Sequence, residues 1–468
     1  MTTRILDEDV VRVRGDLFDA FTGETKAGRV VRTLYWGDSI EFVDEADNAS
    51  ASVRDVRVRL YDYASGEHQE GFVRKRREDG ANVPLRLRPP GAERLLEVTF
   101  VDVGSGDAAL IRTPGGRHLL FDGGEESLVT RLLAATFPGT TAAKPLAIDA
   151  LVVTHGDADH FAGLAALADA PAHPEPRKRI HARVARVYHN GLVMRPAKVD
   201  GKKLRDAERF GKKVAEGGEH YVTELYDDPR KAPVVNDGFA RWNEALDSLL
   251  ARNGAVVRRL AAGDHDAFDF LLGEDIEVRV LGPVTELVDG KPALRILRSA
   301  DGAPSAQQTI NGHALVVKLR FRNVRMLLGG DLTAAGAQRV LDFAAHQHPP
   351  ISLESEIFKV PHHGASDFLP AFLEAVAPVA SLVSCGIALE GHTYPRANVM
   401  AALGRASRSD APLLFSVPLV SRFAAIHVRT DGRRVLLAPE CAPGQLREAY
   451  AWKVDAAGAV TRDAWGIV

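Results

Sequence analysis

Two histidines and two aspartates lie within six positions of the segment HGDADH, residues 155–160. The residues before it, IDALVVT, are apolar and β-branched, as in a buried strand, and FAGLAALADA after it predicts a helix. We therefore expect His155 at a strand end, followed by Asp157, Asp159 and His160 in a loop. Such a cluster can bind a divalent ion, because each ligand atom must lie about 2.0–2.2 Å from the metal. A capped helix with solvated histidines is the simpler alternative, but four such residues together favour a metal site.

Three other predicted strands also end in polar residues. LLFDGG places Asp122 at a strand end, LLGGD places Asp331, and IFKVPHHG places His362 and His363. In a structure of packed sheets and helices these strand ends line one edge, where sites on open sheets form. The glycines of VGSG, residues 103–106, instead indicate a turn between strands, because the lysine of a phosphate-binding loop is absent. His346 and His348 are expected at a helix C-terminus.

Composition sets limits on the class of protein. The chain has 468 residues, of which 46% are hydrophobic and 26% charged, so it can bury a large core and hold more than one domain. The net charge of −3 does not indicate a nucleic-acid binder, and no apolar run suggests membrane insertion. We expect a cytoplasmic protein. Its two cysteines, Cys385 and Cys441, are too few for a disulfide framework, so any metal must bind His, Asp or Glu.

The pattern of strands and helices divides the chain. Residues 1–90 are β-rich and loosely resemble a small SH3-like domain, with the basic, proline-containing segment 74–91 as a linker. Residues 95–440 alternate strands and helices and predict an α/β domain. Within it, residues 195–245 are charged and poor in strand signals, which predicts an insertion with surface helices. Residues 441–468 are expected to be a C-terminal extension.

The ordered set HGDADH, LLGGD and VPHHG resembles the metallo-β-lactamase fold hydrolases. The segment VTFVDVGSGDAALIRTPGGRHLLFDGG resembles the hydrolase domain of the ComEC/Rec2 competence proteins. The resemblance covers about residues 95–435 and implies an α/β fold, a four-layer αββα sandwich. The signature of the family is HxHxDH, and Asp157 stands here at the second histidine. This departure shifts the site toward oxygen ligands and leaves the identity of the metal open.

The resemblance also implies roles for individual residues. His155 and Asp157 would bind one metal ion, Asp331 would bridge two ions, and Asp122 would support the histidine loop from outside. The second ion would be bound by Asp159, His160 and one of His362 and His363.

Two positions are less well defined by the resemblance. TINGHALVVKL offers His313 or Asn311 as the third motif, and VYHNG offers His189; we favour His313. His392, in GHTYPRANVM, resembles a residue that closes the site and would contact a phosphate or act as general acid.

The implied activity is hydrolysis with two divalent ions, zinc or alternatively manganese, that hold a bridging water as hydroxide. Asp159 and His392 would take part in catalysis. A phosphodiester or nucleic acid is the favoured substrate, and an ester, thioester or lactone is the alternative. A non-catalytic binding or regulatory protein that retains the fold is a further hypothesis, and the N-terminal region is a candidate for binding a protein partner.

Overall fold

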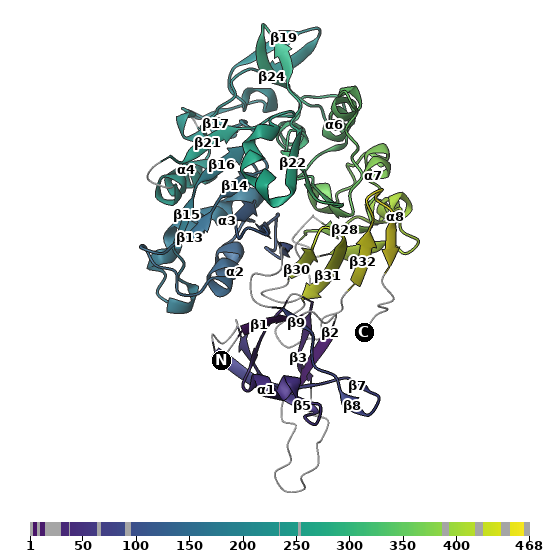
Figure 1. The fold of residues 1–468 in the computed structure, drawn as a ribbon. Coiled ribbons are helices and arrows are strands. Elements are labelled where there is room, and N and C mark those ends of the chain that lie inside the picture. The colour runs from purple at the N-terminus through teal and green to yellow at the C-terminus, as the bar shows by residue number, and fades with distance from the viewer. Residues whose placement is uncertain are drawn as a thin grey trace.

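The computed structural model describes most of the chain. The described residues are 3–6, 10–14, 30–36, 38–62, 67–88, 95–233, 235–250, 254–385, 393–416, 425–440 and 450–462. Figure 1 shows an upper body that contains residues 95 onward and a smaller β-rich body below it.

Two sheets form the centre of the upper body (Figure 1). The ten-stranded sheet has the order β21 (Val256–Arg259), β16 (Arg186–His189), β14 (Ala150–Val153), β12 (His118–Phe121), β11 (Ala109–Arg112), β10 (Leu96–Val101), β30 (Ala425–Thr430), β31 (Arg434–Glu440), β32 (Tyr450–Val454) and β33 (Val460–Arg462). The six-stranded sheet has the order β22 (Ile276–Gly282), β25 (Val316–Phe321), β26 (Val324–Leu328), β27 (Ile357–Lys359), β28 (Ala380–Val383) and β29 (Leu413–Ser416).

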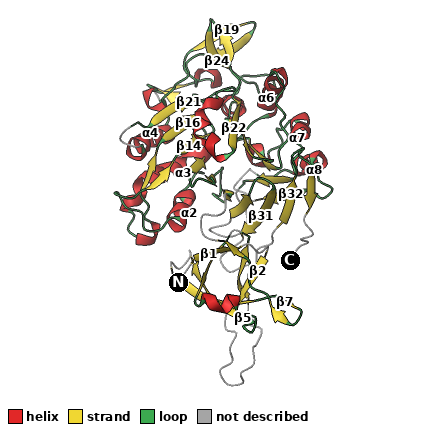
Figure 2. Cartoon of the chain, in the orientation of Figure 1, coloured by secondary structure: helices red, strands yellow, loops and turns green. Residues whose placement is uncertain are grey.

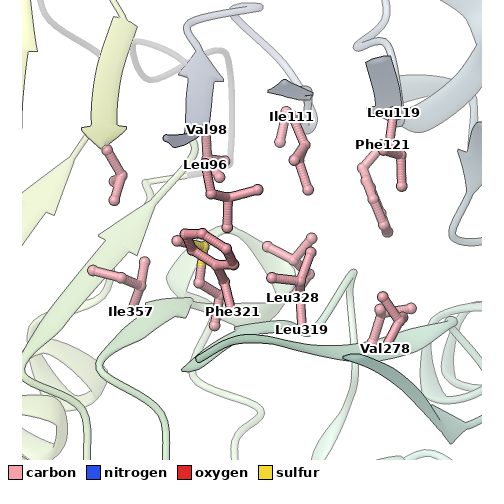
Figure 3. Packing of buried hydrophobic residues seen from close by; sticks show 14 of the residues in the cluster. Leu96, Val98, Ile111, Leu119, Phe121, Val278, Leu319, Phe321, Leu328 and Ile357 are labelled. Atoms are coloured by element: carbon pink, nitrogen blue, oxygen red, sulfur yellow. The ribbon is translucent and has the colours of Figure 1, made fainter. Parts of the chain in front are cut away.

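The two sheets face each other across one hydrophobic core. In β10, Leu96 and Val98 point into this core, whereas Glu97 between them is only half-buried, as the two-residue period of a strand requires. Figure 3 shows Leu96 and Val98 opposite Phe321 and Ile357 of the second sheet. Burial of these apolar side chains stabilises the sandwich at roughly 25 cal/mol per Å² removed from water.

Helices cover the outer face of each sheet (Figure 2). The helices α2 (Leu128–Thr136), α3 (Ala158–Asp169) and α4 (Asp237–Leu249) pack on the first sheet, and α6 (Ala334–His346), α7 (Pro370–Val376) and α8 (Ala397–Ala406) on the second. Each helix presents one apolar stripe to its sheet, such as Trp242 and Leu246 of α4. The expected α/β fold, a four-layer αββα sandwich, is confirmed.

The N-terminal region forms a separate seven-stranded sheet. Its order is β3 (Val30–Tyr35), β2 (Val10–Arg14), β6 (Glu67–Arg74), β5 (Asp55–Asp62), β4 (Ser39–Phe42), β1 (Thr3–Leu6) and β9 (Leu87–Arg88), with the short helix α1 (Glu45–Ala49) and the hairpin of β7 (Arg77–Glu78) and β8 (Ala81–Asn82) attached. The β-rich prediction agrees with this sheet, and the likeness to an SH3-like domain stays a prediction.

Much of the expected linker belongs to this N-terminal sheet. The strand β9 pairs with β1, and the ammonium of Lys75 is buried where it donates hydrogen bonds to the carbonyls of Asp47 and Asn48. The prediction of a linker over 74–91 was therefore wrong for its described part. Basic side chains suggested solvent, but the backbone carbonyls around α1 supply the acceptors that a buried ammonium needs.

The N-terminal sheet contacts the upper body through Trp36. Its indole is buried with Leu436, Ala438 and Ala451 of β31 and β32. Arg429 of β30 donates a hydrogen bond to the carbonyl of Trp36 (3.0 Å) and forms an ion pair with Asp38 (2.7 Å). A shortened chain that begins near Leu95 would expose this apolar patch.

The segment 195–245 differs in part from the prediction. It contains two hairpins, of β17 (Lys198–Val199) with β18 (Lys202–Lys203) and of β19 (Lys213–Glu216) with β20 (Glu219–Val222). In a four-stranded sheet, β20 pairs with β24 (Lys291–Arg295), which in turn pairs with β23 (Glu286–Val288). The helix α4 agrees with the prediction of a surface helix, because it packs one apolar face against α3 and leaves Arg241, Glu244 and Asp247 exposed. The strands were missed because their charged side chains do not alternate with apolar ones.

The C-terminal extension is also part of the fold. The strands β32 and β33 extend the ten-stranded sheet beyond β31, and Trp452 of β32 is buried in the central core. The smaller elements are β13 (Leu146–Ile148), which pairs with β15 (Ala182–Val184), and the helix α5 (Ala306–Gly312). Within the described residues, no helix combines the length and apolarity needed to cross a membrane.

Candidate metal centre

The HGDADH segment joins β14 to α3. Asp157 occupies the N-cap position of α3, and Asp159 and His160 lie in the first turn of this helix rather than in the loop that the sequence predicted. The side chain of Asp157 makes no capping hydrogen bond; it accepts one from Gln307 of α5 (2.6 Å). A simple capped helix therefore does not account for this aspartate.

Three buried imidazoles surround one carboxylate. The Nε2 atoms of His160 and His363 each lie 3.2 Å from an oxygen of Asp331, and the Nε2 atom of His155 lies 4.0 Å from it. The carboxylate of Asp159 is 3.3 Å from His363 Nε2. Asp159, His160, Asp331 and His363 thus bring four ligand-type atoms within 4.8 Å of one another. We call these four residues the compact set.

The other nitrogen of each ring is already engaged. His160 Nδ1 contacts the carboxylate of Asp122 (2.9 Å), which also accepts hydrogen bonds from the amide and hydroxyl of Thr154. His363 Nδ1 donates to the carbonyl of Ser384 (2.8 Å), and His155 Nδ1 lies 3.1 Å from the hydroxyl of Thr154. These contacts fix the orientation of each ring and leave its Nε2 atom facing Asp331.

The backbone at these strand ends is unusual for residues with side chains. Asp122, His362 and His363 have φ values of 55°, 49° and 52°, in the left-handed region that favours glycine. Gly106 (φ 94°) lies so close to the backbone of α3 that a Cβ atom there would be 1.6 Å from the carbonyl oxygen of Asp159. The loop of Gly104 and Gly106 therefore packs against the cluster as a turn between β10 and β11, as expected.

The charges of the cluster depend on one another. Burial acts to lower the pKa of His160 and His363, but the carboxylates beside them, Asp331 above all, raise both pKa values well above 6.5. Burial acts to raise the pKa of Asp331, but His363 and His160 hold it well below its usual value. Without a metal, the protons of two imidazolium groups thus balance the buried carboxylates.

Burial shifts the pKa values of His155 and Asp157 in the direction that favours the neutral form of each group. Burial lowers the pKa of His155 to about 3, with a further contribution from His160. Burial, followed by the nearby charge of Asp159, raises the pKa of Asp157 to about 6. His155 therefore presents an unprotonated ring at neutral pH, which is the form that binds metals.

A buried ion pair that the sequence reasoning missed borders the cluster. Asp107 forms an ion pair with Lys359, and its other oxygen is 3.4 Å from His363 Nδ1. Asp107, Asp122 and His160 also have ligand-type atoms within 4.8 Å of one another. Asp107 directly precedes the predicted strand AALIR and Lys359 lies four residues before His363, so their positions at strand ends could have indicated them.

The helix α5 borders the cluster beside Asp157. One amide group of Gln307 donates to Asp157 Oδ2 (2.6 Å) and to the side-chain oxygen of Asn311 (3.1 Å). The amide nitrogen of Asn311 is 3.3 Å from His362 Nε2. Of the two adjacent histidines, His363 therefore belongs to the compact set and His362 faces Asn311.

The structure does not bring every candidate to the cluster. His313 Nε2 contacts the carbonyl of Arg295 (2.7 Å), and the nearest charges to its ring are those of Arg339, Glu286 and Arg295. His189 contacts the carbonyl of Asp227 (3.0 Å) and the amide of Gly191. Our preference for His313 was therefore misplaced, because Asn311 in the last turn of α5 contacts His362, whereas the C-cap residue His313 contacts Arg295.

Two further histidine predictions have different outcomes. His392 lies outside the described residues. His346 is the last residue of α6, is exposed, and contacts the carbonyl of Asp342 (2.6 Å), as expected for a helix C-terminus.

The residues present fit a metal centre. Among the described residues, the Nε2 atoms of His155, His160 and His363 and the Oδ1 atom of Asp331 are buried without a hydrogen-bond partner. Buried polar atoms almost always have an aligned hydrogen-bond partner, whereas these imidazole nitrogens face the Asp331 carboxylate at 3.2–4.0 Å without one. Imidazole and carboxylate groups that converge unpaired on one position are the ligands that divalent metals use.

Comparisons with known proteins agree with this site. Residues 101–237 match the model of the metallo-beta-lactamase superfamily, a segment that includes Asp107, Asp122 and the HGDADH motif. No curated protein gives a significant match. Among solved structures, a mutant of the CmlA beta-hydroxylase aligns over 90% of this chain and 75% of its own, with 14% identity and a TM-score of 0.31, too low to support a conclusion. The similarity to this superfamily is shown for residues 101–237, which contain the HGDADH motif.

Proposed function

We propose that the protein is a metal-dependent hydrolase of phosphodiesters with a dinuclear centre. One divalent ion would be bound by the compact set, and a second by His155 and Asp157, with Asp331 shared between them. The observation that carries this proposal is the convergence of three unpaired imidazole Nε2 atoms on the Asp331 carboxylate. In such a site, divalent ions supply Lewis acidity and lower the pKa of water to near neutrality.

The protein's own residues hold this centre rigid. Asp122 and the carbonyl of Ser384 fix the rings of His160 and His363, and Lys359 balances the charge of Asp107 beside them. Burial of His160, Asp331 and His363 limits the access of bulk water, which strengthens their electrostatic interactions with a charged substrate. We infer that His392 contacts the phosphate or protonates the leaving group.

A charged hairpin near α5 favours an anionic substrate. Lys198 and Lys203 lie directly opposite each other in the hairpin of β17 and β18, and neither forms an ion pair within the described part of the chain. Like charges in this register repel, and an anion would relieve the repulsion. The turn that follows the hairpin is attached to α5, because Asp206 accepts a hydrogen bond from the amide of Ala306, next to Gln307.

Reconstitution with metals tests the proposed function. Chelated protein would be supplied with Zn²⁺ or Mn²⁺ and assayed on bis-p-nitrophenyl phosphate, p-nitrophenyl acetate and an acyl thioester. We expect metal-dependent hydrolysis of the phosphodiester, and its loss in His160→Gln but not in the matched control His346→Gln, whose histidine is exposed on α6. Faster hydrolysis of the ester or thioester would favour the alternative substrates, and no hydrolysis by metal-loaded protein would contradict an enzymatic role.

A further inference from the structure

The two groups of candidate ligands differ in their chemistry. The compact set offers two imidazoles and two carboxylates, all within 4.8 Å. We call His155, Asp157 and Asn311 the outer set; with the shared Asp331 it offers one imidazole against three side chains that carry oxygen. The difference has two sources. Asp157 stands where the metallo-β-lactamase fold hydrolases have histidine, and the side chain of His313 contacts Arg295 instead of the metal centre.

The oxygen atoms of the outer set converge. The same amide nitrogen of Gln307 donates to Asp157 Oδ2 and to Asn311 Oδ1, so these two oxygens face one position. The Nε2 atom of His155 is 3.9 Å from Asp157 Oδ2, fully buried and without a hydrogen-bond partner. The three side chains of the outer set are thus linked, His155 to Asp157 by their proximity and Asp157 to Asn311 through the amide of Gln307.

Donor type decides which divalent ion such a site favours. Imidazole-rich sites suit zinc, whereas carboxylate and amide oxygens suit magnesium, calcium and manganese. Zinc exceeds manganese in raw affinity for most ligand sets. Because manganese prefers oxygen ligands, this advantage of zinc is smaller where oxygens replace nitrogens. The compact set should therefore retain a strong preference for zinc that the outer set lacks.

We propose that the two positions hold different ions, with Zn²⁺ in the compact set and Mn²⁺ in the outer set. This inference rests on the metal centre of the proposed function and not on hydrolysis. Asp157 and Asn311 are then the residues that determine the identity of the second ion.

Metal stoichiometry tests this proposal without an activity assay. Chelated full-length protein would be given two equivalents each of Zn²⁺ and Mn²⁺, passed through a desalting column and measured by elemental analysis and manganese electron paramagnetic resonance. We expect one Zn²⁺ and one Mn²⁺ per chain. Two Zn²⁺ ions per chain from an equimolar mixture would overturn the proposal, and binding of neither ion would contradict the metal centre itself.

Two variants change the outer set in opposite directions. Asp157→His should shift the outer position toward Zn²⁺ by about tenfold or more in the competition, and Asn311→Asp should shift it toward Mn²⁺. Asp342→His, on the exposed face of α6, is the matched control and should keep the wild-type ratio. Because Asp157 is partly exposed, its replacement should be tolerated, and circular dichroism would verify the fold. An unchanged metal ratio in folded Asp157→His and Asn311→Asp protein would contradict the assignment.

Discussion

Histidines that are equally buried have different surroundings in two neighbouring regions. At the strand ends around Asp331, three imidazoles have one nitrogen engaged and the other unpaired. At the turn from α5 to β25, His313 is just as buried and also has one nitrogen, Nδ1, without a hydrogen-bond partner, but its Nε2 atom contacts the carbonyl of Arg295 and the ring belongs to neither cluster of ligand-type atoms. The difference teaches that burial alone does not mark a ligand; an unpaired nitrogen that faces other ligand atoms does.

The largest expected effect comes from Asp331→Asn, which removes the charge that faces all three Nε2 atoms. Metal content and turnover of bis-p-nitrophenyl phosphate should both fall by more than about 100-fold, because even residues that only support ligands contribute about 10- to 100-fold. Elemental analysis and initial rates would measure this. Asp342→Asn, on the surface of α6, should behave as wild type, and a wild-type metal content in Asp331→Asn would show that Asp331 is not a ligand.

A smaller loss of metal affinity is expected from Asp122→Asn, because Asp122 affects the metal centre only through its contact with His160. The amide keeps the size of the side chain but no longer offers the charge that orients the Nδ1 atom of His160. Metal affinity should fall by about 10- to 100-fold while the fold is retained. A titration with a metal-sensitive dye would measure the affinity. No change in affinity would mean that the contact with Thr154 alone orients the ring.

His313→Gln should change the pH dependence of the free energy of unfolding without changing the metal content. Burial, the largest cause, lowers the pKa of His313 to about 4, so the folded protein keeps this ring neutral while the unfolded chain protonates it below about pH 6.5. The folded state is therefore stabilised above pH 6.5, and this contribution, of the order of 3 kcal/mol, is lost as the pH falls from about 6.5 to 4.

Denaturant unfolding at several pH values would measure this contribution. His313→Gln should be less sensitive to acid over that range than the wild type and should keep its metal content. Loss of metal from this variant would instead place His313 among the ligands.

The smallest effect is expected from the hairpin of β17 and β18. Its two lysines test whether residues outside the metal centre also contribute to binding of the substrate. Replacing both Lys198 and Lys203 with Gln should lower kcat/KM for an oligonucleotide by several-fold, mainly through KM, because two charges that attract phosphates are lost. Hydrolysis of bis-p-nitrophenyl phosphate should change less. Equal loss on both substrates would contradict a role for the hairpin in binding an extended anion.

The outcome of the sequence reasoning depended on how local each signal was. The strands ending at Asp122, His155 and Asp331 were predicted because a run of apolar β-formers followed by Gly and Asp is a local pattern. The strands of 195–245 and the buried Lys75 were not, because their side chains are charged and their partners are distant in sequence.

The sequence by itself determined the alternation of strands and helices and placed the polar motifs at strand ends, since periodicity and turn residues are properties of short segments. The layered sandwich was implied by the resemblance to the metallo-β-lactamase fold hydrolases. Only the tertiary structure decided which of these side chains meet. It placed His363 rather than His362 beside Asp331, turned His313 toward Arg295, and paired Asp107 with Lys359. The physical reason is that ring direction depends on backbone conformation and on partners from other strands, such as the carbonyl of Ser384, which lies 21 residues away along the chain from His363.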